Sequence, residues 1–131
     1  MKTYRKIREE QRTLKAEKFG VFFAFNQEQF REGVKACGYK KGDRIIRWVA
    51  SAYGTAQAIK AYCDALRAFD ERIKKECTPE EVFEHEFWNH ECGLHGDISM
   101  PLHETQAFFP EWLPTEELYR KLMREFREIN G

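Results

Sequence analysis

The sequence lacks long hydrophobic runs and closely paired cysteines, and each absence excludes a class of protein. No apolar stretch in its 131 residues reaches the roughly 20 residues that a membrane-spanning helix needs. The four cysteines, Cys37, Cys63, Cys77 and Cys92, form no CxxC pair, so we expect free thiols in a reducing compartment. The N-terminus is polar and unlike a signal peptide. We therefore expect a cytoplasmic protein that does not enter a membrane.

The short motifs that mark common enzymes are also missing. The chain has no HExxH motif of zinc proteases, no glycine loop that would cradle phosphates and no dinucleotide-binding fingerprint. No pattern of serine, histidine and aspartate indicates a catalytic triad. We consequently expect a non-enzymatic protein without a cofactor and without catalytic residues.

Positive charge is absent from one long stretch of a chain whose net charge is zero. Residues 77–114 contain no lysine or arginine, and residues 76–117 carry 11 acidic side chains. Residues 1–75 instead hold 18 lysines and arginines against 9 acidic residues. This asymmetry is typical of segments that meet partners of opposite charge, although it also arises when two segments of one fold face each other.

What is present predicts a single α+β domain over residues 1–131. It would comprise a basic part (1–75), an acidic segment rich in histidine and aromatic residues (76–117) and a C-terminal helix (116–129). Apolar periodicity and capping residues predict helices over residues 3–18, 27–37, 56–76, 79–92 and 116–129. About four of these would be main helices that pack on a small antiparallel sheet.

The sheet is predicted from short aromatic and β-branched runs. These runs predict strands at residues 20–25 and 44–53, with a third strand around 98–100 that would support the pair. Glycine and proline mark residues 94–114 as a loop, with one helical turn around 103–109.

All four histidines lie in the segment without positive charge, and they leave a metal site open as an alternative. Histidine and cysteine are the common ligands of zinc. His85 and His90 would point about 140° apart on a helix, so they do not form a ligand pair. The remaining candidates around the predicted helix end are His90, Cys92 and His95, which His103 or Cys77 could join through folding. Such a site would make the protein a small metal-binding protein or a hydrolase.

Two other interpretations compete for the same histidines. Nucleophilic catalysis by Cys92, with His90 or His95 as the base, is disfavoured, because a helix C-terminus and acidic neighbours both raise a thiol pKa. The commoner outcome is structural. His90 would then enter the edge of the core, where Glu86, one helical turn earlier, could accept its N–H.

A further interpretation uses the whole acidic segment as a surface for a basic protein. Aromatic residues are interleaved with the acidic ones in this segment. If the aromatic side chains are exposed, they would anchor a partner; if they are buried, they would form the core of the domain. The candidate partner-binding residues are Glu81, Glu84, Trp88, Glu91, Asp97 and Glu104. A nucleic-acid-binding effector is one such partner, because an acidic surface competes with nucleic acid for a cationic groove. Direct nucleic-acid binding by the N-terminal half is an alternative that we do not favour; its candidate residues are Lys2, Arg5, Arg8, Arg12 and Lys15.

Three stretches resemble a family of small uncharacterised proteins from phages and mobile elements of gut bacteria. They are Phe22-Phe23-Ala24-Phe25, Glu28-Gln29-Phe30 with Gly33, and Asn89-His90-Glu91-Cys92. The resemblance implies no established activity. It implies an accessory protein of a mobile element that binds and blocks a host protein, for example an inhibitor of a host defence system such as an anti-CRISPR protein. We expect this non-enzymatic binding function.

Overall fold

A computed structural model describes residues 2–130, which divide into two compact units. Unit 1 comprises the chain up to Glu9 and from Asp70 onward, and unit 2 comprises Glu10–Phe69. Within residues 2–130, six α-helices and a three-stranded antiparallel sheet confirm the α+β class, while the expected number of about four main helices is too low. That both units act as a single domain stays a prediction. No helix in the described part of the chain is long and apolar enough to cross a membrane.

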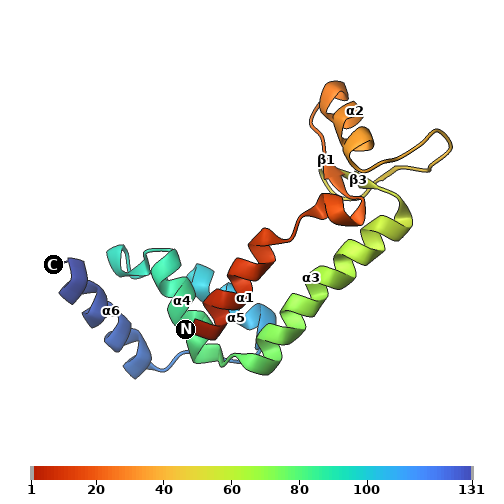
Figure 1. The fold of residues 1–131 in the computed structure, drawn as a ribbon. Helices are drawn as coiled ribbons and strands as arrows, with labels where there is room; N and C mark the ends of the chain where they lie inside the picture. Colours follow the sequence, from red (N-terminus) through yellow and green to blue (C-terminus); the bar gives the residue numbers. More distant parts are fainter. Residues whose placement is uncertain (1, 131) are drawn as a thin grey trace. The chain divides into compact units, whose positions relative to one another are not determined.

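Unit 2 contains the whole sheet, together with helix α2, which lies beside β1 (Figure 1). Strand β3 is central, and both β1 and β2 pair with it in antiparallel register, so that Tyr53 lies opposite both Phe22 and Arg47. The unit also includes the larger part of α3 and a short 3-10 helix, η1. The bounds are η1 (Ala16–Phe19), β1 (Phe22–Phe23), α2 (Gln27–Ala36), β2 (Ile46–Arg47), β3 (Ala52–Gly54) and α3 (Ala56–Glu76).

The predicted strand at 44–53 is wrong as a single element, because a turn divides it into β2 and β3. Ala50 has a φ of 44°, a left-handed backbone conformation that interrupts an extended strand. The Trp48 N–H donates to the Ala52 carbonyl across this turn. The third strand, β3, therefore begins within the run predicted as one strand and extends to Gly54. The strand expected around 98–100 is wrong because α5 begins there.

The Phe22 ring occupies the centre of an aromatic cluster in unit 2. It is buried, with its centroid 5.3 Å from that of Phe30 and 5.8 Å from that of Tyr53. Helix α2 can approach this ring because Gly33 has no side chain; a Cβ there would overlap the ring. The Asn26 side chain caps the helix by accepting the Gln29 N–H at 2.8 Å, as the sequence predicts.

Unit 1 is helical. Helices α4 and α5 lie side by side (Figure 1), and the unit also holds the start of α1 and the end of α3. The helix expected at 3–18 ends at Thr13, and the loop expected at 94–114 contains a ten-residue helix, α5. The bounds are α1 (Lys2–Thr13), α4 (Pro79–Asn89), the 3-10 helix η2 (Cys92–Leu94), α5 (Ser99–Phe108) and α6 (Glu116–Asn130).

The core of unit 1 uses aromatic residues from the acidic segment. Phe83 and Phe87 of α4 are fully buried with Leu122 of α6. Trp88 and Trp112 are half-buried and pack against this cluster. These aromatic residues of the segment therefore contribute to the core, and its acidic side chains lie largely around it.

Candidate metal centre

Helix α4 places Glu86 and His90 one turn apart on the same face. The helix begins at Pro79, with Thr78 as its N-cap; the Thr78 Oγ1 accepts the Glu81 N–H at 3.2 Å. It ends at Asn89, with His90 as the C-cap residue. Residues four apart on a helix are neighbours, so the side chains of Glu86 and His90 can reach the same point.

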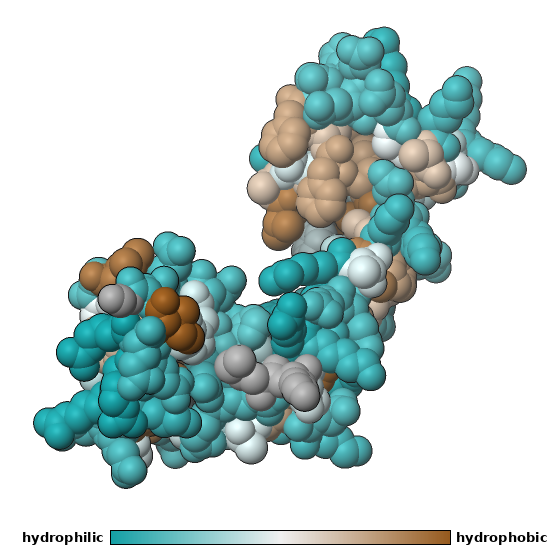
Figure 2. Space-filling model, turned by 60° about the vertical axis from the view of Figure 1, so that its left-hand side comes forward, coloured by the Kyte–Doolittle hydropathy of each residue, from teal (hydrophilic) through white to brown (hydrophobic). Residues whose placement is uncertain are grey.

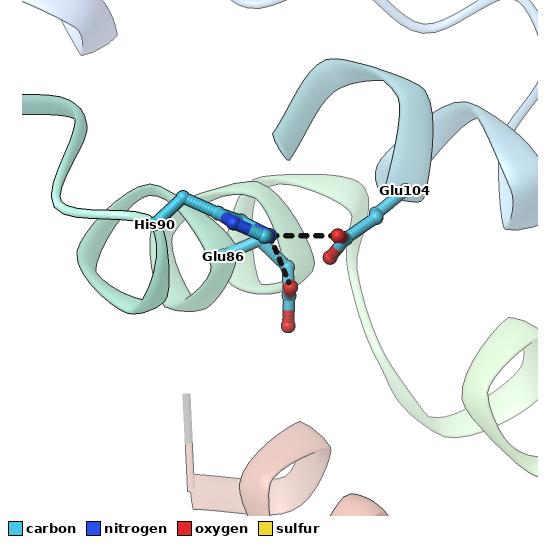
Figure 3. A group of neighbouring side chains, drawn as sticks. All are labelled: Glu86, His90 and Glu104. Carbon is cyan, nitrogen blue, oxygen red and sulfur yellow. Dashed lines mark hydrogen bonds and ion pairs between the residues drawn. The ribbon is translucent and has the colours of Figure 1, made fainter. Parts of the chain in front are cut away.

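Helix α5 brings a second carboxylate to that point (Figure 3). His90 Nε2 lies 2.7 Å from Glu104 Oε1 and 3.5 Å from Glu86 Oε2. One ligand atom from each of the three residues lies within 4.8 Å of the other two. Glu86 is only 5% exposed, while His90 and Glu104 are half-buried, so the group opens to solvent on the side of His90 and Glu104.

A tyrosine on α1 orients the buried carboxylate. The Tyr4 hydroxyl donates to Glu86 Oε1 at 3.1 Å and accepts a hydrogen bond from Arg8 Nε at 2.9 Å. Since arginine only donates, the single hydroxyl proton of Tyr4 is directed at Glu86. Burial raises the pKa of Tyr4 to about 12, despite the opposing effect of Arg8, so the hydroxyl keeps its proton at neutral pH.

His85 and Phe108 complete the surroundings of this network. His85 Nε2 lies 3.9 Å from Glu86 Oε1, and the His85 ring meets the Tyr4 ring edge-on at a centroid distance of 5.1 Å. The Arg8 guanidinium lies over the rings of both Tyr4 and Phe108. The Tyr4 hydroxyl and the His85 imidazole therefore flank Glu86 Oε1, and Phe108 contacts this network through Arg8.

The chemistry of these three groups suits a divalent cation. Two carboxylates lie beside one imidazole, and a cation between them would neutralise negative charge on the side that opens to solvent, opposite the Tyr4–Arg8 pair. One nitrogen and two oxygen donors are common ligands of Zn²⁺, Fe²⁺ and Mn²⁺. Ligand atoms bound tetrahedrally to zinc lie about 3.4 Å apart. The 3.5 Å between His90 Nε2 and Glu86 Oε2 is close to this value. The 2.7 Å between His90 Nε2 and Glu104 Oε1 is a hydrogen-bond distance, so these two groups would move apart on binding an ion.

The residues expected in a histidine–cysteine site do not all gather here. His90 belongs to the group, whereas Cys92, His95 and His103 are absent from the one candidate ligand group found among the described residues. Cys92 is buried in the core, and burial, aided by the charge of Asp97, raises the pKa of its thiol. His95 is exposed and accepts the Asp97 N–H at 3.0 Å, and His103 is also exposed.

The expected partner-binding residues are spread over different environments. Glu104 belongs to the candidate metal centre, and Trp88 stacks on Phe126 at a centroid distance of 5.5 Å. Glu81 and Glu84 are half-buried, and Glu81 Oε1 accepts the Tyr4 N–H. Only the remaining two, Glu91 and Asp97, are exposed.

The basic residues of the N-terminal half also differ in their surroundings. Arg8 is engaged with Tyr4, whereas Arg5, Arg12 and Lys15 are exposed. The side chain of Lys2 lies outside the described side chains.

The sequence interpretation missed Glu86 as a ligand and Tyr4 and Arg8 as its supports. The spacing of Glu86 and His90 by four residues was visible as a signal for one ligand pair. Glu104 comes 14 residues after His90 and Tyr4 comes 82 residues before Glu86. Their approach depends on the packing of separate helices, which no local pattern reveals.

Fold and centre together define an α+β protein with a candidate His–carboxylate metal site. The chain belongs to the Family of unknown function (DUF7659), whose model matches residues 3–110. The matched region contains every residue of the centre, from Tyr4 to Glu104, and stops before α6. No curated protein and no solved structure matches the chain significantly.

Proposed function

We propose that this protein binds one divalent metal ion through Glu86, His90 and Glu104. The observation that carries the proposal is the convergence of three ligand atoms from α4 and α5 within 4.8 Å of one another. Metal ligands are commonly oriented by a second layer of hydrogen bonds, and the Tyr4–Arg8 pair supplies such a layer for Glu86. The bound ion would balance the two carboxylates and join α4 to α5.

Isothermal titration calorimetry with Mn²⁺ and Zn²⁺ tests the proposal on the full chain after chelation. Glu104→Gln keeps the size of the side chain and removes a charged ligand, so we expect at least a tenfold loss of affinity, since even second-layer changes weaken metal sites by about 10- to 100-fold. Glu91→Gln is the matched control, because it removes an exposed carboxylate outside the centre. Equal affinities for the wild type and Glu104→Gln would sink the proposal.

We also propose, on a separate observation, that the acidic segment contacts a basic protein. Glu91 and Asp97 are exposed, and beside them in the chain Leu94 and Met100 expose 70% and 53% of their surfaces. Exposed apolar side chains among acidic ones favour a partner with a basic surface. An accessory role on a mobile element, such as inhibition of a nucleic-acid-binding defence protein, is the form of this function that we propose.

Charge reversal tests the interaction surface. Wild-type protein and the double variant Glu91→Lys/Asp97→Lys would be used as baits in the same lysate, with Glu117→Lys as a control at an exposed acidic position on α6. A partner of this surface is retained by the wild type and the control and lost by the double variant. Retention of the same proteins by all three baits would contradict the role of Glu91 and Asp97.

A further inference from the structure

A groove in unit 2 lies between η1, β1 and α2 and belongs to neither proposal above. Its volume is about 460 Å³. Its floor is the buried Phe22 ring, against which α2 packs at Gly33. Figure 2 shows hydrophobic side chains gathered on the surface of this unit.

Two phenylalanines line the groove with their rings in solvent. Phe23 is 55% exposed and Phe25 is 83% exposed, although burying such a ring would be favourable by about 2 kcal/mol. The backbone that carries them is fixed. Phe23 is paired with Ala52 in the sheet, and the Phe25 N–H donates to Gln29 Oε1 at 2.8 Å. The groove therefore presents aromatic faces from an ordered segment.

The charge of the groove is opposite to that of its unit. Residues 10–69 contain 11 lysines and arginines against 6 acidic residues. Yet the residues lining the groove include two carboxylates, Glu17 and Glu32, and no basic side chain. Within residues 2–130, neither of these glutamates forms an ion pair, and both are exposed. Negative charge is thus concentrated where the aromatic rings are exposed.

We propose that this groove binds an arginine side chain presented by a polypeptide partner. A guanidinium is planar, stacks on aromatic faces and pairs with carboxylates, so Phe23 and Phe25 would contact its faces while Glu17 and Glu32 would accept its N–H groups. Within the groove itself, the two carboxylates disfavour an anionic ligand. A purely apolar ligand would leave both carboxylates unpaired at its edge.

The test is a nuclear magnetic resonance titration of the full chain with a short synthetic peptide that contains two arginines. The matched peptide carries citrulline, which keeps the shape of arginine and removes its charge. We expect the arginine peptide to bind with a Kd of roughly 1 mM or tighter, to shift the resonances of Phe23 and Phe25, and to bind at least tenfold more tightly than the citrulline peptide.

Variants at exposed positions connect this binding to the groove. Glu32→Gln and Glu17→Gln should each weaken binding of the arginine peptide at least threefold. Glu28→Gln, which removes an exposed carboxylate of α2 that does not line the groove, should leave it unchanged. The proposal is overturned if both peptides bind equally or if the arginine peptide binds with a Kd weaker than roughly 1 mM. It is also overturned if the shifts lie away from the groove or if all three variants have an equal effect.

Discussion

Replacing Tyr4 by phenylalanine removes the hydroxyl group through which α1 supports the candidate metal centre. The ring is fully buried and its packing is retained in the variant. Two hydrogen bonds are lost: the one donated to Glu86 Oε1 and the one accepted from Arg8 Nε. In the variant, Glu86 would still lie close to His90. It would no longer receive the hydrogen bond that the Tyr4 hydroxyl donates to Oε1.

The expected loss of stability follows from the charge and burial of Glu86. A hydrogen bond to a charged group contributes about 1.5–3 kcal/mol, compared with about 1 kcal/mol for a neutral pair. Glu86 is 5% exposed, so water cannot readily replace the missing donor. Arg8 is half-buried and reaches solvent, so its loss adds little. We therefore expect Tyr4→Phe to lower the free energy of unfolding of unit 1 by about 2 kcal/mol.

Urea denaturation followed by tryptophan fluorescence measures this change. A Trp48→Phe background leaves Trp88 and Trp112 as reporters, and both lie in unit 1. The control is Tyr119→Phe in the same unit, which removes a hydrogen bond to the neutral carbonyl of Gly96 and should lower the free energy by about 1 kcal/mol or less. A loss in Tyr4→Phe no larger than in the control would refute the assigned role of the hydroxyl. Titration of the variant with Mn²⁺ should also show a metal affinity about 10- to 100-fold weaker.

Further predictions concern three single positions. Burial and nearby carboxylates raise the pKa of Cys77 from 9.0 to about 11, which lowers its thiolate population at pH 8 about 100-fold. Cys77 should therefore be alkylated far more slowly in the folded protein than in urea-unfolded protein. Timed alkylation followed by mass spectrometry measures this difference. Because this pKa is raised on folding, the stabilising contribution of Cys77 should be present below pH 9 and lost towards pH 11. Urea titrations of the wild type and of Cys77→Ala at both ends of that range would separate it from the loss caused by Tyr4, whose pKa is also raised. Gly33→Ala should destabilise unit 2 by about 1–3 kcal/mol because a Cβ overlaps the Phe22 ring; a stabilised variant, the usual result inside a helix, would show that the ring can move. Asn26→Ala should lower the free energy of unfolding of unit 2 by about 1 kcal/mol through loss of the N-cap of α2. For both of these variants urea denaturation is followed through Trp48, which lies in unit 2, and no change in Asn26→Ala would mean that another group replaces the cap.

Local capping chemistry explains why several helices could be predicted from the sequence. Thr78 followed by Pro79 fixes the start of α4, and Thr55 caps α3, which spans the predicted residues 56–76. Asn26 does the same for α2. These signals act between residues three positions apart, so they operate before any tertiary contact forms.

The wrong secondary-structure predictions arise at residues that are compatible with two different local structures. Pro101 was interpreted as a loop marker, but it lies in the first turn of α5, where the missing N–H would have no helical partner. The run at 44–53 contains the strand formers Ile45, Ile46, Trp48, Val49 and Tyr53. Its weak strand formers, residues 50–52, do not by themselves identify Ala50 as the position of the turn. The candidate site shows the same limit. The pair Glu86 and His90 follows from helix geometry, whereas the approach of Glu104 depends on how α4 packs against α5.

The most direct measurement of the central claim is native mass spectrometry of untagged protein with stoichiometric Mn²⁺ or Zn²⁺, before and after treatment with a chelator. Binding at Glu86, His90 and Glu104 predicts a mass increase of one metal ion per chain, which the chelator removes and which His90→Ala lacks. The Ala variant is informative because His90 is half-buried at the end of α4 and its loss leaves the helix cap at Thr78 intact. A spectrum that shows only the metal-free mass, or equal metal loading of wild type and variant, would contradict the claim.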